Sequence, residues 1–515
     1  MMFKIPKPSR RTKFDRLLSI EMNDFDVERL LPTLFNLVVT RGRNRTSGNN
    51  EERTVSQFAE GLSKNPHVKG FGGDEKELLE LWIRSVALTV GQAGRTKSQE
   101  KIEFVNPSTL LTYKTGLPKP SSRQRNVPRF LYNAMCNCGL EGNNNERRLN
   151  IQLWLKEVFG TGLQMQDTPP YSGQYDGSTE VDIHTLLTLR LLEEFDTGAI
   201  SNQELGEPPP CLPKQAQQIG ENILLLLRGY RGLLPPMFIG RMLMATINLD
   251  LLTYTLRLMA SISVLCRTGK MPVDDGYIPE IYLDVTGDRT GQSDSLARSC
   301  VERDLEATGK FFENNIRLFT LDRLRERSDE LQKLVVSDDN TPVAQYFESL
   351  LASEATTPVR VRAESDLESI RDESLVDVSG EQEQEQIRNE LKDLISRKGP
   401  IAALNSVLCE SLRTKSVQSY TQWYKGVGGL NRPFGILLGN TLGPRNWRYV
   451  MTDELLRTLV YLKAVDTHRG QLNESRPAAS IRLDEFMNWM QEKFGIVIDR
   501  PPKEMNSSSS RAAPL

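Results

Sequence analysis

A dense apolar region between residues 216 and 265 constrains the fold of this chain more than any other segment. Its apolar side chains recur with helical periodicity, which predicts helices over residues 216–228, 236–248 and 251–267. Glycine, arginine and proline break the most apolar windows, so that none reaches the roughly 20 residues that cross a bilayer. We therefore interpret the region as the central core of a soluble, cytoplasmic protein without a membrane span.

The length of the chain, 515 residues, exceeds what one hydrophobic core normally holds, so we expect a mainly α, multi-domain protein. The expected parts are an N-terminal helical domain with basic loops (1–170), a central helical core (171–352), an acidic linker (353–387), a C-terminal domain (388–502) and a disordered tail (503–515). The linker is placed by composition, because residues 364–390 hold ten acids and two arginines.

The C-terminal domain is expected to contain helices over residues 387–396, 400–414, 416–424, 452–462 and 483–494. The segment GIVI follows the last of these and predicts an edge strand. Helices that end in a short strand or hairpin are typical of a winged helix, and a plain helical bundle explains the pattern nearly as well.

Residues 16–40 also show helical periodicity, and Pro32 is expected to begin a new helix there or to kink this one. The segment RGRNRTSGNNEER that follows has no apolar residue and predicts an exposed loop. Further helices are expected over residues 56–64, 75–91, 130–138, 146–159, 181–195 and 293–334, with short strands near residues 102–105 and 278–283.

The histidine, cysteine and glycine patterns give no support for catalysis. His67, His184 and His468 lie far apart and in no metal-binding spacing. Of six cysteines only Cys136 and Cys138 are close, which is a poor zinc signal and fits reduced thiols. The glycines between residues 426 and 443 lack the Lys-Ser/Thr pair of a phosphate-binding loop. We therefore expect a protein that is not an enzyme and has no cofactor or metal.

One cluster of carboxylates could still hold a metal ion. It lies in VDDGYIPEIYLDVTGDR and comprises Asp274, Asp275, Glu280, Asp284 and Asp288. A nuclease of the PD-(D/E)xK kind needs a lysine two residues after its second acid, to activate water beside the metal. Tyr282 and Thr286 stand at those positions. We prefer a solvent-facing strand pair with acidic turns, and keep a divergent metal-dependent nuclease that uses Asp274, Asp275, Glu280 or Asp284 as an alternative.

Basic residues are the most informative local signal, since residues 1–45 hold ten of them against five acids. Arginines in loops beside Ser, Asn and Gly suit contacts with the phosphates of DNA or RNA, and they also suit docking to the acids of a protein partner. The candidate nucleic-acid-binding residues are Arg10, Arg11, Lys13, Arg41, Arg43, Arg45, Lys119, Arg123, Arg125, Arg129, Arg432, Arg445 and Arg448.

Two stretches carry a family resemblance, EMNDFDVERLLPTLFNLVVTRGRNR and GGLNRPFGILLGNTLGPRNWRYVMTDELLRTLVYL. They resemble a subunit of bacterial multi-gene anti-phage defence islands of the methylation-associated type. The resemblance implies partners encoded nearby, among them a DNA methyltransferase, kinases and an ATPase. It implies no role for any single residue, because the two stretches contain no catalytic motif.

These observations favour a non-catalytic accessory or scaffold subunit of an anti-phage defence complex. We expect it to contact DNA through its basic loops and a C-terminal winged helix, and to work with an ATPase that supplies energy. One alternative is a viral-type nucleoprotein, in which a two-lobed helical body clamps RNA in a basic cleft. The other is the divergent nuclease described above.

Overall fold

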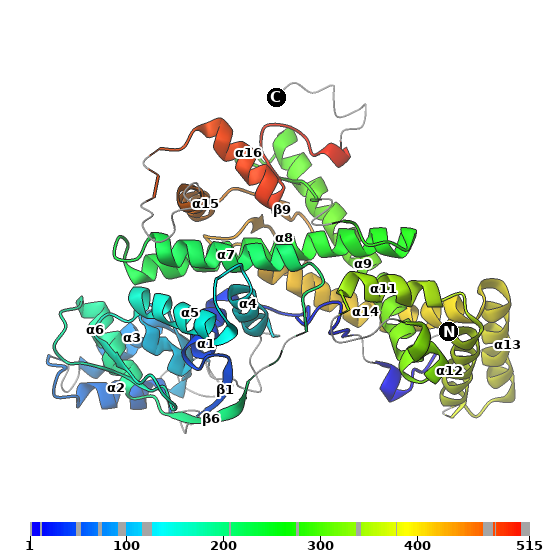
Figure 1. Cartoon of the computed structure of the whole chain (residues 1–515), viewed down its shortest axis with the longest axis horizontal. Coiled ribbons are helices and arrows are strands. Elements are labelled where there is room, and N and C mark those ends of the chain that lie inside the picture. The colour runs from blue at the N-terminus through cyan, green and yellow to red at the C-terminus, as the bar shows by residue number, and fades with distance from the viewer. Residues whose placement is uncertain are drawn as a thin grey trace.

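The computed structural model describes residues 3–10, 13–47, 53–70, 75–90, 99–115, 126–204, 206, 208–273, 278–335, 341–376, 378–466, 477–478 and 480–505. Helices dominate these residues, and the strands are short and pair only two at a time (Figure 1). The mainly α class predicted from the sequence is confirmed.

Helix α8 (Pro236–Thr268) runs through the centre of the molecule (Figure 1). It packs against α7 (Pro213–Gly229), α9 (Gln292–Glu326), α14 (Pro400–Val427) and α15 (Asp453–Asp466). The sequence predicted two helices where α8 is continuous, and no Gly or Pro lies between residues 248 and 251 to end the first. Of the described helices, α8 is long and apolar enough to cross a membrane, but 78% of its most apolar window is buried inside the fold, as in many core helices.

The described part of residues 30–204 forms the lobe at the left of Figure 1. Its inner layer is α1 (Leu30–Val39), α4 (Val127–Cys136) and α5 (Asn144–Phe159), which join the core through α7. Its outer layer contains α2 (Val55–Ser63), α3 (Lys76–Val86) and α6 (Ile183–Glu193). Three antiparallel strand pairs complete it: β1 (Arg43–Ser47) with β6 (Thr197–Glu204), β2 (Ala87–Val90) with β3 (Lys101–Val105), and β4 (Leu163–Met165) with β5 (Gly173–Tyr175).

Residues 13–27, here called the strap, are an irregular segment rather than the start of the predicted helix. The 3-10 turn η2 (Val27–Arg29) leads into α1, so helix formation begins at residue 27. Asn23 Oδ1 accepts a hydrogen bond from Asp24 N, and Asp26 Oδ1 accepts one from Glu28 N, and such local bonds compete with a helix. The apolar residues of the strap are buried because it crosses the core between helices. Pro32 lies in the first turn of α1, as expected of a proline that begins a helix.

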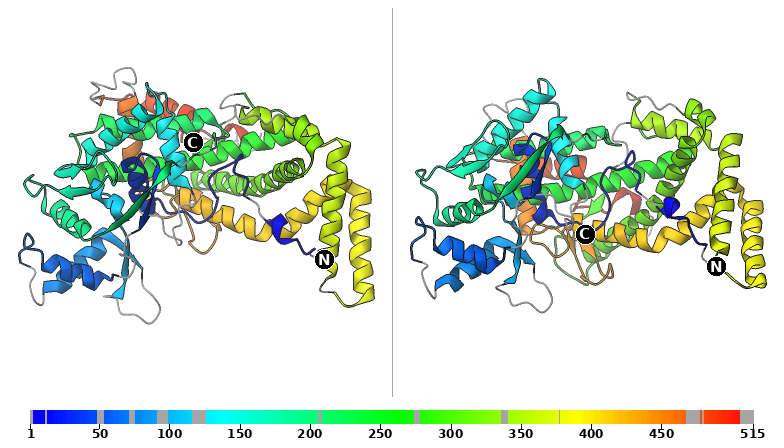
Figure 2. Two further views of the ribbon diagram at one scale, coloured as in Figure 1. Left: turned by 60° about the horizontal axis from the view of Figure 1, so that its bottom comes forward. Right: turned by 90° about the horizontal axis from the view of Figure 1, so that it is seen from below.

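Residues 353–387, interpreted above as an acidic linker, are largely helical. They include α12 (Thr357–Leu375) and the first turns of α13 (Glu381–Lys398). On α12, Val359, Ala363, Leu367 and Ile370 recur at three- and four-residue steps and are buried against α9 and α14. The acids that suggested a linker lie mostly on the exposed faces. Figure 2 shows α12 and α13, in yellow, at the opposite end of the molecule from α2 and α3.

The predicted terminal strand is present as β10 (Ile496–Val497), but the winged helix is not confirmed. β10 follows α16 (Leu483–Phe494) and pairs in parallel with β7 (Ile281–Tyr282) of the central region, not with a C-terminal neighbour. The small pair β8 (Leu437–Leu438) and β9 (Arg448–Tyr449) lies in the glycine-rich segment before α15. One cluster of buried apolar side chains extends from Ile5 to Val497, and the domain boundaries stay predictions.

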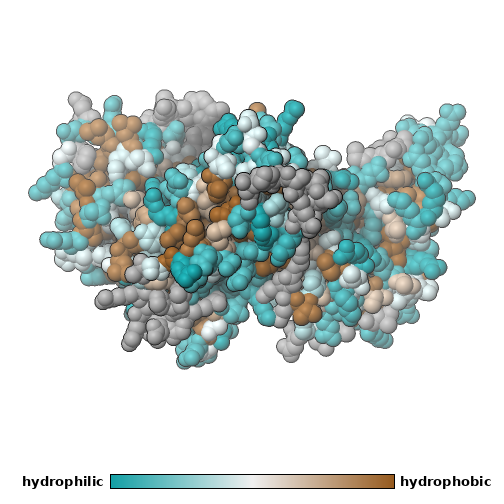
Figure 3. All heavy atoms as spheres, turned by 90° about the horizontal axis from the view of Figure 1, so that it is seen from above, coloured by the Kyte–Doolittle hydropathy of each residue, from teal (hydrophilic) through white to brown (hydrophobic). Residues whose placement is uncertain are grey.

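The remaining described helices are short: η1 (Lys7–Arg10), η6 (Leu110–Thr115), α10 (Asp329–Leu334), α11 (Val343–Ser353) and η8 (Lys503–Met505). Residues 506–515 of the predicted disordered tail lie outside the described residues. On the face shown in Figure 3, apolar patches alternate with polar ones at both ends of the molecule.

Candidate functional site

The strap is held on the core by aromatic contacts at both of its ends. The ring centroid of Phe14 lies 5.6 Å from those of Phe319 and Phe347, and that of Phe25 lies 5.3 Å from that of Trp423. Near Phe25 the strap touches α14 at Gly426, where a Cβ atom would come within 2.5 Å of the Phe25 carbonyl oxygen. A glycine at this position is therefore required for the close contact between the strap and α14.

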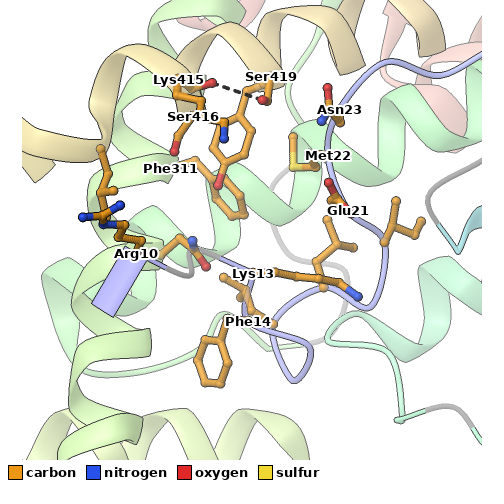
Figure 4. A pocket seen from close by; sticks show the side chains of 16 residues that line it. Arg10, Lys13, Phe14, Glu21, Met22, Asn23, Phe311, Lys415, Ser416 and Ser419 are labelled. Atoms are coloured by element: carbon orange, nitrogen blue, oxygen red, sulfur yellow. Dashed lines mark hydrogen bonds between the residues drawn. The ribbon is translucent and has the colours of Figure 1, made fainter. Parts of the chain in front are cut away.

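A pocket of about 430 Å³ opens between the strap, α9 and α14. We call it the strap pocket. Its charged lining residues are Arg10, Lys13, Glu21 and Lys415. Figure 4 shows strap side chains on one side and Lys415, Ser416 and Ser419 of α14 on the other, with Phe311 of α9 between them.

The strap pocket has three cations and one carboxylate in its lining. The Nε of Arg10 donates to the Ile5 carbonyl oxygen at 2.8 Å, and Arg10 is exposed. The Nζ of Lys13 lies 2.7 Å from Asp15 Oδ1. Lys415 is exposed on α14, where it faces the strap across the pocket. Asp15 compensates Lys13, so the remaining excess of positive charge comes from Arg10 and Lys415 against Glu21, and it favours an anionic ligand.

The second predicted basic group, Arg41, Arg43 and Arg45, is mostly engaged within the protein. Arg45 is 1% exposed; it donates to the Pro170 carbonyl oxygen at 2.6 Å and lies over the ring of Tyr113. Arg41 donates to Gln152 Oε1 at 3.0 Å, and Arg43 is half-buried on β1. Arg45 therefore presents no surface to a nucleic acid in this structure.

The remaining predicted basic residues are dispersed. Arg129 donates to the Gly206 carbonyl oxygen, Arg432 pairs with Glu28 at 3.4 Å, and Arg445 is exposed. Arg448 is buried and its Nε lies 3.1 Å from Asp294 Oδ1. Arg11, Lys119, Arg123 and Arg125 lie outside the described residues. Of the predicted residues that the structure describes, Arg10 and Lys13 line the strap pocket together, and the structure adds Lys415 to them.

Lys415 was missed by sequence reasoning because a single lysine on an exposed helix face carries no distinguishing signal. Its importance comes from the strap, which lies nearly 400 positions away in sequence and crosses α14 beside it. No spacing rule within α14 contains that information.

The predicted carboxylate cluster is divided between different structural roles. Glu280 is buried and accepts hydrogen bonds from Arg500 at 2.7 and 2.9 Å and from Lys503 N at 2.8 Å. Burial would raise the pKa of Glu280, but these bonds and the charges of Arg500 and Lys503 outweigh it and hold the pKa at about 2. Glu280 is therefore an ion-pair partner that attaches the segment after β10 to the core.

Asp284 is also enclosed, and Ser293 and Thr286 donate to its Oδ1, both at 2.7 Å. Burial opposes ionisation, but these hydrogen bonds lower the pKa of Asp284 below its usual value. Asp274 and Asp275 lie outside the described residues, and Asp288 is exposed. Within the described part of the chain, no group of three or more His, Cys, Asp or Glu side chains is arranged to hold a metal ion.

The described histidines are isolated from one another: His67 is exposed, and His184 makes an edge contact with Trp82. His468 lies outside the described residues. The six cysteines, all of which the structure describes, form no disulfide, and burial raises the pKa of Cys138 to about 12, which disfavours the reactive thiolate.

Comparison with known proteins gives one match. The family model for the methylation-associated defense system protein MAD7 matches residues 7–513. No curated protein and no solved structure matches the chain.

Proposed function

Because the chain belongs to the MAD7 family of methylation-associated defense system proteins, we propose that it is a non-catalytic accessory subunit that contacts DNA through the strap pocket. Family membership gives it a role in anti-phage defence beside other subunits of that system. In the proposal it acts in the cytoplasm, and an ATPase of the system supplies the energy for any movement of the DNA.

The charge of the strap pocket is the observation that carries the DNA contact. Arg10, Lys13 and Lys415 face one carboxylate, Glu21, around an opening large enough for a phosphate group. Cations that neutralise backbone phosphates release counterions, which gives affinity without sequence preference. Binding through this pocket is therefore expected to be strong at low salt and independent of DNA sequence.

The non-catalytic part of the proposal is supported by the state of the two described acids that sequence analysis held as nuclease candidates. Glu280 is bound to Arg500 and to the Lys503 amide, and one oxygen of Asp284 is bound to two hydroxyl groups. Protein donors therefore occupy lone pairs of Glu280 and of Asp284 Oδ1 that a metal-dependent nuclease would give to its metal, whereas Asp284 Oδ2 has no hydrogen-bond partner.

The DNA contact is tested with the triple variant Arg10→Ala, Lys13→Ala, Lys415→Ala. Fluorescence anisotropy with a labelled DNA duplex is measured over a range of salt concentrations. We expect binding at low salt to weaken by about ten- to a hundredfold. The slope of log affinity against log salt should fall by about 2 to 3, near 0.9 for each phosphate that the variant no longer neutralises.

The matched control removes the same charge elsewhere, with Arg388→Ala, Arg397→Ala and Arg482→Ala. These arginines are exposed, and each pairs with an acid on its own helix or turn. Equal weakening in both triple variants would show a general charge effect and contradict the proposed site. Magnesium- or manganese-dependent DNA cleavage that disappears in Asp284→Ala would contradict the non-catalytic part.

A further inference from the structure

A second pocket, also about 430 Å³, lies at the other end of the strap. Its walls are strap residues 24–27, the C-terminal turn of α14, the glycine-rich turn at residues 429–434, and Asn248 from the middle of α8. Residues 24–27 and 429–434 belong to the two separate sequence stretches quoted above, and the fold brings them to the same place.

Asn248 is the feature of this pocket that demands an explanation. It is 2% exposed, and neither its Oδ1 nor its Nδ2 has a hydrogen-bond partner in the structure. A buried amide without partners destabilises a fold, so such groups are rare. Two positions further along α8, the buried Asp250 accepts hydrogen bonds from Asn222 at 2.9 and 3.1 Å. On the same helix, therefore, Asp250 has a protein partner and the Asn248 amide has none.

The glycine-rich turn keeps space beside this amide. Gly429 has φ +58°, and a Cβ atom there would come within 2.8 Å of Gly435 Cα and 3.0 Å of Asn248 Nδ2. Any larger residue would press on both the turn and the amide. Gly429 therefore meets two needs, the left-handed backbone and free space beside Asn248.

The charges of this pocket balance, unlike those of the strap pocket. Its lining has two acids, Asp24 and Asp26, and two cations, Lys425 and Arg432. The Nζ of Lys425 donates to the Thr441 carbonyl oxygen at 3.1 Å, and Arg432 pairs with Glu28 at 3.4 Å. A phosphate would find no excess of positive charge here, so the lining favours a neutral ligand.

The apolar part of the lining suits a flat ring. Phe25 and Phe434 are buried, and Phe25 is fixed by its contact with Trp423. An asparagine amide offers one donor beside one acceptor, which matches the amino group and ring nitrogen that adenine presents side by side. The volume lies within the range of small-molecule sites.

We propose that this pocket, the Asn248 pocket, binds a purine base or nucleoside whose donor and acceptor pair with the Asn248 amide. The inference does not depend on the DNA contact of the strap pocket, because a different set of residues carries it. The base can come from a free nucleoside or from a nucleotide in a single strand, and the probes below distinguish these sources.

The test is isothermal titration of the full-length protein with adenosine, with uridine as the pyrimidine comparison. Asn248→Leu removes both amide groups at nearly constant volume, and we expect at least tenfold weaker adenosine binding. The ligand-free melting temperature should equal or exceed that of the unmodified protein, because the unsatisfied amide is gone. Asn389→Leu, an exposed amide on α13, is the matched control and should leave adenosine affinity unchanged.

A second variant guards against misfolding of Asn248→Leu. Gln422 is an exposed lining residue, so Gln422→Trp fills the opening without altering the core, and it should reduce adenosine binding by a similar factor. A short single strand of deoxyadenosines is the second probe, and binding of the strand without binding of adenosine assigns the base to a nucleic acid. Absence of binding by both probes overturns the proposal, as does full affinity in both variants.

Discussion

The strap pocket and the Asn248 pocket share a strap and a helix, yet they differ in the chemistry that they offer. Each has a volume of about 430 Å³ and is formed where the strap meets α14. Three cations and one acid line the first, whereas balanced charges and a buried, unsatisfied amide line the second. The two volumes are nearly equal, so charge and hydrogen bonding must decide which ligand each pocket takes.

The difference shows how one irregular segment can build two unlike sites. A helix would place its side chains at fixed steps, whereas the strap contributes Lys13 and Glu21 to one pocket, and Asp24, Asp26 and a tight backbone contact to the other. Its tight contact at Gly426 fixes the second pocket, while the first is open at a charged rim. We expect the two sites to respond differently to substitution.

The largest expected effect concerns Asp250, the buried side chain on α8 that has a hydrogen-bond partner and with which Asn248 is compared. Burial raises the pKa of Asp250 to about 7, although Asn222, Lys493 and Arg257 oppose the shift. A carboxyl whose pKa is higher in the folded state than in the unfolded state makes its full contribution to the stability of the fold below about pH 4. That contribution is lost as the pH rises through 7. Over this window the protein should lose up to about 4 kcal/mol relative to Asp250→Asn.

Urea unfolding at pH 5 and pH 8.5 measures about 3 kcal/mol of this difference, because the unfolded carboxyl is already mostly ionised at pH 5. The control Asp484→Asn changes an exposed acid beside Arg482 and should not alter the pH profile in this range. Parallel profiles for the unmodified protein and Asp250→Asn would mean that Asp250 is not protonated in the fold, and the contrast with Asn248 would lose its basis.

The next largest effect is expected from a substitution that displaces the strap from α14. In Gly426→Ala the new Cβ would approach the Phe25 carbonyl oxygen, which should cost about 2 kcal/mol of unfolding free energy, as for other overpacked sites. Gly426→Ala should weaken adenosine binding more than DNA binding, because the contact borders the Asn248 pocket. Gly443→Ala is the control, since no atom lies within 4 Å of its added Cβ. Equal loss of both ligands would show that the two pockets are one unit.

A smaller effect separates the pockets by charge. Lys415→Glu should weaken DNA binding at low salt by about tenfold, near 1.4 kcal/mol, because it reverses a charge in the strap pocket. Adenosine binding should not change, because Lys415 does not line the Asn248 pocket. Anisotropy and calorimetry on the same preparation measure both, with Lys392→Glu on α13 as the control. A change in adenosine affinity would show that the two sites are coupled.

The smallest effect is expected when the charge of the Asn248 pocket is made more similar to that of the strap pocket. Glu28→Gln removes the acid that pairs with Arg432, so that the guanidinium of Arg432 is available to the phosphate of a ligand. At pH 8 we expect the ratio of adenosine monophosphate affinity to adenosine affinity to rise by about two- to threefold. This factor corresponds to the free energy of a surface ion pair. Burial raises the pKa of Glu28, so the difference should shrink as the pH falls and the unmodified carboxyl is protonated. A constant ratio would show that charge balance does not select the ligand.

Much of the fold could be predicted, because helices of amphipathic sequence are encoded locally. The helix predicted at residues 483–494 coincides with α16, and that at 146–159 nearly matches α5. The errors come from tertiary contacts: the strap has helical periodicity but is buried on several sides, and α12 is acidic but keeps a buried apolar stripe. Composition averages over all faces of a helix. It therefore cannot distinguish acids on the exposed face of a packed helix from acids in a linker.

The candidate sites were less accessible to prediction, because they depend on long-range contacts. Arg10 and Lys13 were predicted from local charge, and the structure adds Lys415 to them. Arg45 belongs to the same kind of basic loop in sequence, yet β1 turns it into the protein, where carbonyl groups and Tyr113 surround it. Asn248 carries no signal in an apolar helix, since its missing partners are known only from the fold.

The pairing of β7 with β10 bears on how the chain reaches its native state during synthesis. Glu280 and Arg500 are separated by 220 positions, so β7 and its acid leave the ribosome long before their partners exist. At ordinary rates of translation the delay is roughly 10 to 40 seconds. For that interval the nascent protein exposes a bare strand edge and a lone carboxylate at its centre, which makes it a natural client for chaperones that shield unfinished chains.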